Sequence, residues 1–242
     1  GICMLLGLLQ FVLGQKYLVG VGDFLGKSTN VEDQEALKRP LNKMEKDRVI
    51  VLILSFLMVI VFFGAFEQAG GLMNIYASEK TNRMLMGWEV PASWFQSLNA
   101  FFIIVLGAAV ANFWANRKLK GKEASSLFKM IAGLIIMGTG FLFMTAATAQ
   151  FESSGSSAMY WLVLAYMFHT VGELSLSPVS LSFVTKLAPA KYASLMMGLY
   201  FATTGLGNKL AGLLGELLIR LFLKKLKALT HGAEDNEKRI AQ

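Results

Sequence analysis

The sequence predicts an all-α integral membrane protein with five or six membrane-spanning helices. Of its 242 residues, 55% are hydrophobic and only 16% are charged, whereas soluble domains carry about 25% charged residues. The apolar residues gather in segments longer than the roughly 20 residues that a helix needs to cross a bilayer. Lysine and arginine give a net charge of +7 and lie mainly between these segments. Their position indicates cytoplasmic loops rather than nucleic-acid binding.

The first part of the chain holds two apolar segments joined by a polar one. Residues 1–18 are apolar up to Lys16, with no basic region before them and no small-residue cleavage site after them. They are therefore expected to be the end of a membrane helix rather than a signal peptide. Residues 19–47 are predicted to form a cytoplasmic linker, and residues 48–78 a long membrane helix.

The remaining apolar segments run close together to the end of the chain. The predicted spans are 92–115, 125–150, 159–187 and 191–215, followed by an apolar remnant at 217–223 and a cytoplasmic tail at 224–242. The remnant supplies only about 10 Å of helix at 1.5 Å per residue, against a bilayer core about 30 Å thick. Residues near Glu216–Arg220 are therefore expected to be missing from this sequence. The alternative is that the tail is an amphipathic helix on the outer surface.

The basic residues divide the loops between the two sides of the membrane. Lysine and arginine are frequent in 14–48, 116–129, 186–191 and 220–242. The loops 79–92 and 151–158 hold only Lys80 and Arg83. The positive-inside rule makes the first set cytoplasmic and the second set external. The two sets alternate between successive spans up to residue 215, which supports the assignment of those spans.

Polar side chains recur at helical spacing within four of the spans. They are Glu67, Gln68, Gly71, Asn74 and Ser78, then Gln96 and Asn99, then Tyr166, His169, Glu173 and Ser177, and finally Tyr200, Thr204 and Asn208. Polar groups at bilayer depth must face one another or water, so these stripes predict a shared polar cavity. For serine, threonine and asparagine, hydrogen bonding between helices is the alternative. The two mid-span carboxylates favour a function, because burying each costs at least about 3 kcal/mol.

Some residues within the spans predict bending or close packing. Pro178 removes the backbone hydrogen bond to Leu174 and is expected to bend its helix just beyond Glu173. Gly205 and Gly207 permit close helix contact or gating. Lys209 is explained by snorkelling to the membrane interface.

The sequence lacks three common enzyme signatures. It has no H-E-x-x-H, G-x-S-x-G or P-loop motif. Gly20–Asp23 match the GxGD of intramembrane aspartyl proteases, but they lie in the polar linker and no second membrane aspartate accompanies them. Two histidines and one cysteine are too few for a metal site. We therefore expect no enzyme activity, no metal and no cofactor.

Longer motifs point to a known family. They are FEQAGGLMNIY (66–76), WFQSLNA (94–100), GELSLSPVSLSFVTKLAP (172–189) and GLYFATTGLGNKLAG (198–212). In this order they closely resemble the carboxyl-terminal half of proton-dependent oligopeptide transporters, the peptide branch of the major facilitator superfamily. The resemblance covers about residues 1–215. It implies two six-helix bundles with the substrate between them, of which this chain holds the end of helix 6, a linker, helices 7 to 11 and a remnant of helix 12.

The resemblance also implies roles for individual residues. Glu173 resembles the group that pairs with the peptide's amino terminus. Glu67 resembles a protonation site that forms a salt bridge with a basic residue of helix 1, and Asn99 a group that binds the peptide backbone. Further pocket residues are Gln68, Trp161, Ser177 and Tyr166, with Pro178, Gly205 and Gly207 as hinge or gating positions. The implied function is proton-coupled symport of di- and tripeptides across the bacterial inner membrane.

The sequence departs from the family's pattern, and other readings remain open. The amino-terminal bundle, with the basic residues for the peptide carboxylate, and the helices often found between the bundles are absent, so this chain is expected to supply half a site. The expected partners are peptides, protons, lipid and the missing bundle, without nucleic acid.

A transporter for another small solute, such as nitrate or an amino-acid-like compound, is the alternative function. Glu173 would, however, repel an anion that lacks an amine. A membrane scaffold would not need two mid-span carboxylates.

Overall fold

The structure, a computed structural model, describes residues 2–17 and 40–240. The chain divides into two compact units, residues 1–45 and 46–242. In the first unit, the apolar segment forms α1 (Ile2–Gly14) and a 3-10 turn, η1 (Gln15–Tyr17). Most of the predicted linker 19–47 lies outside the described residues.

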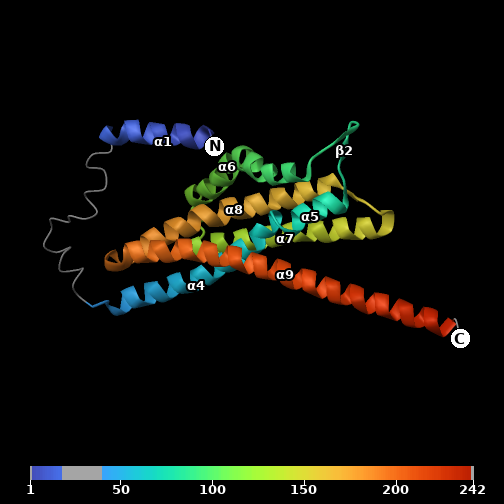
Figure 1. Cartoon of the computed structure of the whole chain (residues 1–242). Coiled ribbons are helices and arrows are strands. Elements are labelled where there is room, and N and C mark those ends of the chain that lie inside the picture. Colours follow the sequence, from blue (N-terminus) through green and yellow to red (C-terminus); the bar gives the residue numbers. More distant parts are fainter. Residues whose placement is uncertain (1, 18–39, 241–242) are drawn as a thin grey trace. The chain divides into compact units, whose positions relative to one another are not determined.

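The rest of the described chain is predominantly helical (Figure 1). Its helices are α4 (Lys43–Phe66), η2 (Glu67–Ala69), α5 (Leu72–Glu79), η3 (Ala92–Gln96), α6 (Ser97–Leu119), α7 (Ser126–Ser154), α8 (Met159–Leu187), η4 (Ala190–Tyr192) and α9 (Ala193–Ile240). Two short strand pairs lie in the loops. Strand β1 (Thr81–Asn82) is parallel to β4 (Ser157–Ala158), and β2 (Met84–Leu85) is antiparallel to β3 (Trp88–Glu89).

Four of the described helical segments are long and apolar enough to span a membrane. They are Lys43–Glu79, Ala92–Leu119, Ser126–Ser154 and Met159–Leu187. The chain is thus an all-α membrane protein. The further span predicted at 191–215 forms the first half of α9, which is not among these four segments.

Local sequence signals account for several helix ends. Before α4, the Asn42 side chain accepts a hydrogen bond from Glu45 N, and the Glu45 side chain accepts one from Asn42 N, which makes a capping box. Helix α7 begins after Ser125, whose hydroxyl accepts a bond from Phe128 N at 3.2 Å. It ends at Gly155, which has the left-handed conformation, with φ +74°, that favours glycine.

The long helix predicted at 48–78 is broken in the structure. Helix α4 ends at Phe66, a single 3-10 turn follows, and α5 begins at Leu72. Between them lie Gly70 and Gly71, and Gly71 has ψ −101°, far from the helical value. Consecutive glycines lose the most conformational freedom in a helix, so this is where the span most easily gives way.

Helix α9, by contrast, is continuous where the sequence predicts separate segments at 191–215, 217–223 and 224–242. Residues 193–240 contain no proline to interrupt the backbone hydrogen bonds. Across the predicted boundary, Arg220 Nη2 lies 2.6 Å from Glu216 Oε1, one helical turn away. Such a pair favours the helical conformation of this segment.

Helix α8 contributes to two apolar clusters that organise the larger unit. The first cluster joins it to α4, α7 and α9 through residues such as Phe62, Met137, Leu176 and Tyr200. The second joins it to α5 and η3 through Met73, Phe95 and Leu162, among others. Apolar side chains from α4, α5, α7, α9 and η3 therefore pack against the helix that carries Glu173.

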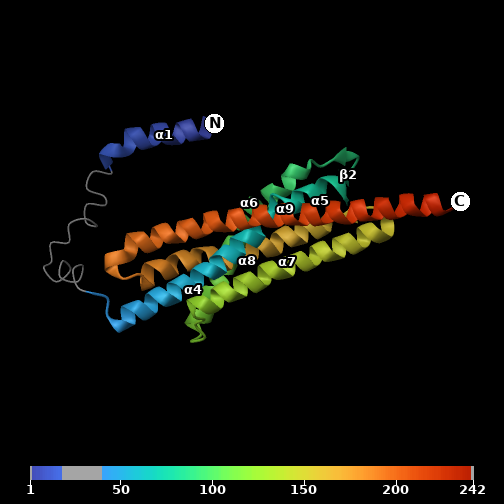
Figure 2. The same ribbon diagram turned by 60° about the horizontal axis from the view of Figure 1, so that its bottom comes forward.

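Glycines let the helices around α8 approach closely. A Cβ atom on Gly133 of α7 would lie 2.7 Å from the carbonyl oxygen of Gly172 in α8, and the reverse distance is also 2.7 Å. Helix α9 contacts α4 in the same manner, because a Cβ on Gly207 would lie 2.6 Å from Phe63 Cβ. Figures 1 and 2 show these helices side by side or crossing. Of the two predicted gating glycines, Gly207 is thus at a packing contact, whereas a Cβ on Gly205 would meet no described residue of another helix within 4 Å.

These contacts predict different effects for the same substitution on one helix. Gly133→Ala should lower the melting temperature, because overpacking between two backbones costs about 1–3 kcal/mol. Gly138→Ala is the matched control, since its new methyl group meets nothing within 4 Å. It should leave the melting temperature unchanged or raise it, as alanine favours a helix over glycine by about 1 kcal/mol. Thermal unfolding of the purified complete protein in detergent measures both, and equal melting temperatures would contradict the close α7–α8 contact.

Candidate functional site

Glu173 is held on α8 by a polar contact with the neighbouring helix α6. Asn99 Nδ2 donates to Glu173 Oε2 at 2.9 Å and also lies 3.2 Å from Thr170 Oγ1. Thr170 in turn donates to the backbone oxygen of Tyr166 at 2.8 Å. No described lysine or arginine forms an ion pair with Glu173. The carboxylate is therefore oriented by an amide, while its charge has no cationic partner in the described part of the chain.

Glu173 lines a cavity of about 540 Å³ between α8 and α9. Its other lining residues are Phe63, Ile103, Leu174, Ser177, Pro178, Leu181, Tyr200, Phe201 and Thr204. The predicted pocket residue Ser177 and the predicted hinge Pro178 therefore lie beside Glu173. Pro178 is inside α8 and does not end the helix. Apart from Glu173, the lining is apolar or carries only hydroxyl groups, so the carboxylate dominates the electrostatics of this cavity.

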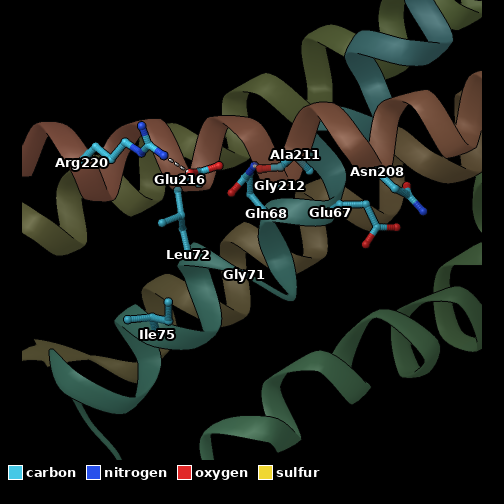
Figure 3. Close-up of a pocket in the computed structure, with 11 residues that line it drawn as sticks. Glu67, Gln68, Gly71, Leu72, Ile75, Asn208, Ala211, Gly212, Glu216 and Arg220 are labelled. Atoms are coloured by element: carbon cyan, nitrogen blue, oxygen red, sulfur yellow. Dashed lines mark hydrogen bonds and ion pairs between the residues drawn. The ribbon is translucent and has the colours of Figure 1, made fainter.

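Glu67 lies at the break between α4 and α5 and lines a different cavity, of about 500 Å³ (Figure 3). The remaining lining comes from the break, α5 and α9: Gln68, Gly71, Leu72, Ile75, Asn208, Ala211, Gly212, Gly215, Glu216 and Arg220. Figure 3 shows Glu67 and Asn208 pointing to the same side of α9. Arg220 is the one cation in this lining, and it pairs with Glu216 rather than with Glu67.

Glu67 and Glu173 thus line two different cavities among the described residues, not one shared cavity. Gly207 and Phe63 bring α9 and α4 into close contact.

Two predicted pocket residues instead fasten the broken helix to its neighbours. Gln68 Nε2 donates to the backbone oxygen of Ala211 in α9 at 3.0 Å. Tyr166 Oη donates to the backbone oxygen of Ala69 at 2.8 Å and thereby joins α8 to the break. Tyr166 is 2% exposed and lines neither of the two cavities, whereas Gln68 also lines the cavity of Glu67. Irregular backbone inside a membrane needs such partners for its free polar groups.

Trp161 is also engaged in structure rather than in either cavity. Its indole Nε1 donates to Gln150 Oε1 at 2.9 Å, and the same oxygen accepts a bond from Ala158 N at 2.8 Å. Gln150 therefore holds the end of α7 to the beginning of α8. Trp161 lines neither of the two cavities described above, and its place in the pocket stays a prediction.

Several contacts at the site were not predicted from the sequence. Thr170 belongs to the Asn99–Glu173 group, and only its position three residues before Glu173 could have indicated this. His169 is 1% exposed, its ring centroid is 4.6 Å from that of Phe141, and neither ring nitrogen has a partner among the described residues. Gly140 leaves room for that ring, since a Cβ there would lie 2.5 Å from His169 Cδ2.

Comparison with known proteins places this arrangement in context. Residues 23–227 match the model of the POT family. The chain is 37% identical over 177 residues to the peptide transporter YePEPT of Yersinia enterocolitica, and 29% identical over 185 residues to the dipeptide and tripeptide permease B of Photorhabdus luminescens. These alignments cover 72% and 76% of this chain, but the chain spans only 35% and 38% of the length of the two relatives.

Solved structures give the same result for the fold. A crystal structure of a peptide transporter POT in complex with sulfate has a TM-score of 0.63 at 31% identity, covering 90% of this chain and 40% of the transporter. A mutant of a peptide transporter POT in complex with alafosfalin has a TM-score of 0.64 at 28% identity, covering 88% and 41%. The chain therefore has the fold of part of a major facilitator-type transporter.

The bonds to the broken helix lead to a prediction for Tyr166. Tyr166→Phe removes the hydroxyl that donates to Ala69, at a cost of about 1 kcal/mol. Amide hydrogen exchange in residues 67–73 should therefore become about fivefold faster, because local opening becomes easier. Tyr160→Phe is the control, since Tyr160 is 51% exposed and lies away from the break. Unchanged exchange in Tyr166→Phe would mean that this hydrogen bond does not hold the break closed.

Proposed function

The chain belongs to the POT family, and we propose on that basis that it forms part of a proton-coupled symporter for di- and tripeptides in a bacterial inner membrane. The observation that carries this proposal is the Asn99–Glu173 contact beside a cavity, with a carboxylate that has no cation among the described residues. The names of the relatives support peptides as the substrate class. Because the chain spans a little over a third of their length, it would supply one part of the binding site.

Glu173 is the proposed binding group for the amino terminus of the peptide. A peptide zwitterion needs an anion at one end of its site and a cation at the other. Asn99 occupies one carboxylate oxygen of Glu173 at 2.9 Å and so fixes the orientation of the group. The other oxygen remains for an ammonium donor, which forms a charge-assisted hydrogen bond of about twice the usual strength. The cation for the peptide carboxylate would come from the bundle that this chain lacks.

Glu67 is the proposed proton-coupling group. Its side chain is exposed at the break between α4 and α5, and its one cationic neighbour in the cavity lining is paired with Glu216. A carboxylate in such a place binds a proton more or less tightly as a basic residue from the other bundle approaches or leaves. Proton uptake, when the basic partner leaves, would then be linked to closure of the bundles. Pro178, Gly205 and Gly207 are proposed to absorb part of the accompanying bending.

Transport of another small solute is the competing proposal. The electrostatics of the Glu173 cavity discriminate between the two. A free carboxylate repels nitrate or any anion without an amine, whereas it attracts the ammonium of a peptide or of an amino-acid-like compound. Uptake competition among a dipeptide, an amino acid and nitrate in liposomes containing the complete transporter would decide between these substrates.

The role of Glu173 predicts loss of transport in Glu173→Gln. The substitution keeps the shape and the bond to Asn99 but removes the charge that pairs with the ammonium. Uptake of a labelled dipeptide by the complete transporter in liposomes should fall at least about 100-fold, since a buried charge pair contributes about 3 kcal/mol or more. Glu152→Gln, at an exposed position near the end of α7, is the matched control and should transport normally. Full uptake by Glu173→Gln would exclude the proposed role.

The role of Glu67 predicts a different defect. Glu67→Gln should lose accumulation driven by a proton gradient but retain counterflow exchange, because exchange moves peptide without net proton movement. Both are measured with the same liposomes, with an imposed pH difference in one case and preloaded unlabelled peptide in the other. Glu79→Gln, at the exposed end of α5, is the control. If Glu67→Gln still concentrates peptide against its gradient, Glu67 is not the coupling group.

A further inference from the structure

The loop between α5 and η3 forms a short, well-defined β-hairpin. Strands β2 and β3 pair antiparallel, with Met84 opposite Glu89 and Leu85 opposite Trp88. Met86 and Gly87 make the two-residue turn and have φ +51° and +84°. Positive φ at both positions is typical of the turn type that matches the twist of a hairpin. Met86 is the one described non-glycine residue with positive φ, so the turn places a large apolar side chain at an unusual position.

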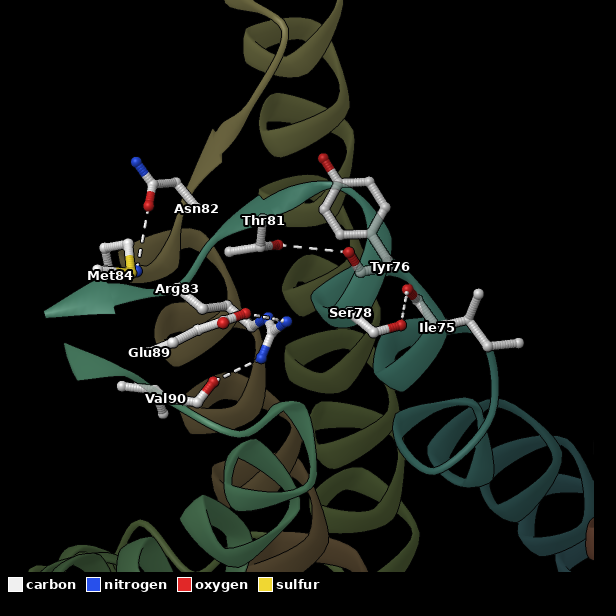
Figure 4. Close-up of polar contacts among 9 residues, drawn as sticks. All are labelled: Ile75, Tyr76, Ser78, Thr81, Asn82, Arg83, Met84, Glu89 and Val90. Carbon is white, nitrogen blue, oxygen red and sulfur yellow. Dashed lines mark hydrogen bonds and ion pairs between the residues drawn. The ribbon is translucent and has the colours of Figure 1, made fainter.

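Polar contacts fix the base of this hairpin (Figure 4). Arg83 Nη2 lies 2.6 Å from Glu89 Oε1, and Arg83 Nη1 donates to Val90 O at 2.7 Å. The backbone adds a bond from Val90 N to Arg83 O at 2.9 Å. The two residues before Arg83 form β1, which pairs with β4 in the loop between α7 and α8. Next to this pair, Ser157 N donates to Lys80 O at 2.9 Å. The hairpin is therefore held in one orientation by the rest of the structure.

The tip of the hairpin is apolar and exposed. Met86 is 101% exposed, and Met84, Leu85 and Trp88 are 55%, 53% and 50% exposed. The one acid and the one base of the hairpin, Glu89 and Arg83, neutralise each other. A rigid protrusion that presents apolar side chains and no net charge indicates a contact surface rather than a solvated loop.

The position of the hairpin identifies the membrane as its partner. Trp94 is the third residue of the spanning segment Ala92–Leu119 and is 59% exposed. Its ring centroid is 5.2 Å from that of Trp88, so the hairpin packs against the beginning of this span. Tyr160, at the beginning of the span Met159–Leu187, is also exposed. Tryptophan and tyrosine concentrate at this level of membrane proteins, where an apolar body and a polar tip both find partners.

We propose that the hairpin tip, residues 84–88, inserts into the interfacial region of the lipid leaflet on the side that the lysine and arginine distribution predicts to be external. Trp88 and Trp94 lie at the headgroup level, and Met86 and Leu85 reach the upper acyl chains. Strand β2 begins two residues after the end of β1 and five after the end of α5. Its insertion therefore anchors the outer half of the broken helix to the membrane.

The proposal is tested with a fluorescent label on the tip in the complete protein. Met86→Cys, in a background without Cys3 or other cysteines, is labelled with an environment-sensitive dye and reconstituted into liposomes with or without lipids brominated on the upper acyl carbons. Interfacial side chains lie about 5–10 Å into the boundary between headgroups and chains, so fluorescence should fall about twofold with brominated lipid. Ser153→Cys, exposed at the end of α7 on the same predicted side, is the control and should be unaffected.

A second variant tests the chemistry of the contact. With the dye on Leu85→Cys, Met86→Asp should abolish the quenching, because a charge at the tip opposes insertion. Aspartate tolerates positive φ, so the turn is preserved. A dye on position 86 that is accessible to iodide and unaffected by brominated lipid would overturn the proposal. A dye that is shielded from both quenchers would overturn it as well, since the tip would then pack against protein.

Discussion

The larger unit depends on the accommodation of one carboxylate, Glu173, inside an apolar span. An ionised group at bilayer depth is costly unless protein or water surrounds it. Here Asn99 supplies the direct contact, and Thr170 completes it with a bond to the backbone of its own helix. This contact joins α6 to α8, and α8 in turn belongs to both apolar clusters of the unit. The buried carboxylate and the centre of packing are therefore on the same helix.

Close packing limits the space between the helices around α8. Where a glycine faces a backbone, as Gly133 faces Gly172, two helices touch and no space remains between them. Gly207 against Phe63 has the same effect between α9 and α4. Small residues on these helices therefore serve as packing contacts. A Cβ on Gly205, by contrast, would meet nothing within 4 Å.

The membrane fold and the family, both predicted from the sequence, are confirmed by the comparisons. The pattern of apolar segments and specific motifs such as GELSLSP carries enough information for both. The contacts of Gln68, Tyr166 and Trp161 could not be predicted, because helical spacing indicates the face of a side chain but not the carbonyl oxygen that it will meet. The break at Gly70 and Gly71 was not predicted, since two adjacent glycines are compatible with either a continuous or a broken helix. The continuity of α9 was not predicted, because loop-charge rules take no account of local helical pairs such as Glu216 and Arg220.

The break in the first long span has a consequence for coupling. Glu67 is the first residue of the 3-10 turn, and the next two residues are tied to α9 through Gln68 and to α8 through Tyr166. A change of charge on Glu67 therefore acts on a segment of backbone that two neighbouring helices hold. In a continuous helix, the same change would be resisted by a full set of i to i−4 hydrogen bonds. In the broken one, movement costs only a few side-chain bonds of about 1 kcal/mol each. On the proposed role of Glu67 as the coupling group, a change of charge at this break would be transmitted to α8, on which Glu173 lies.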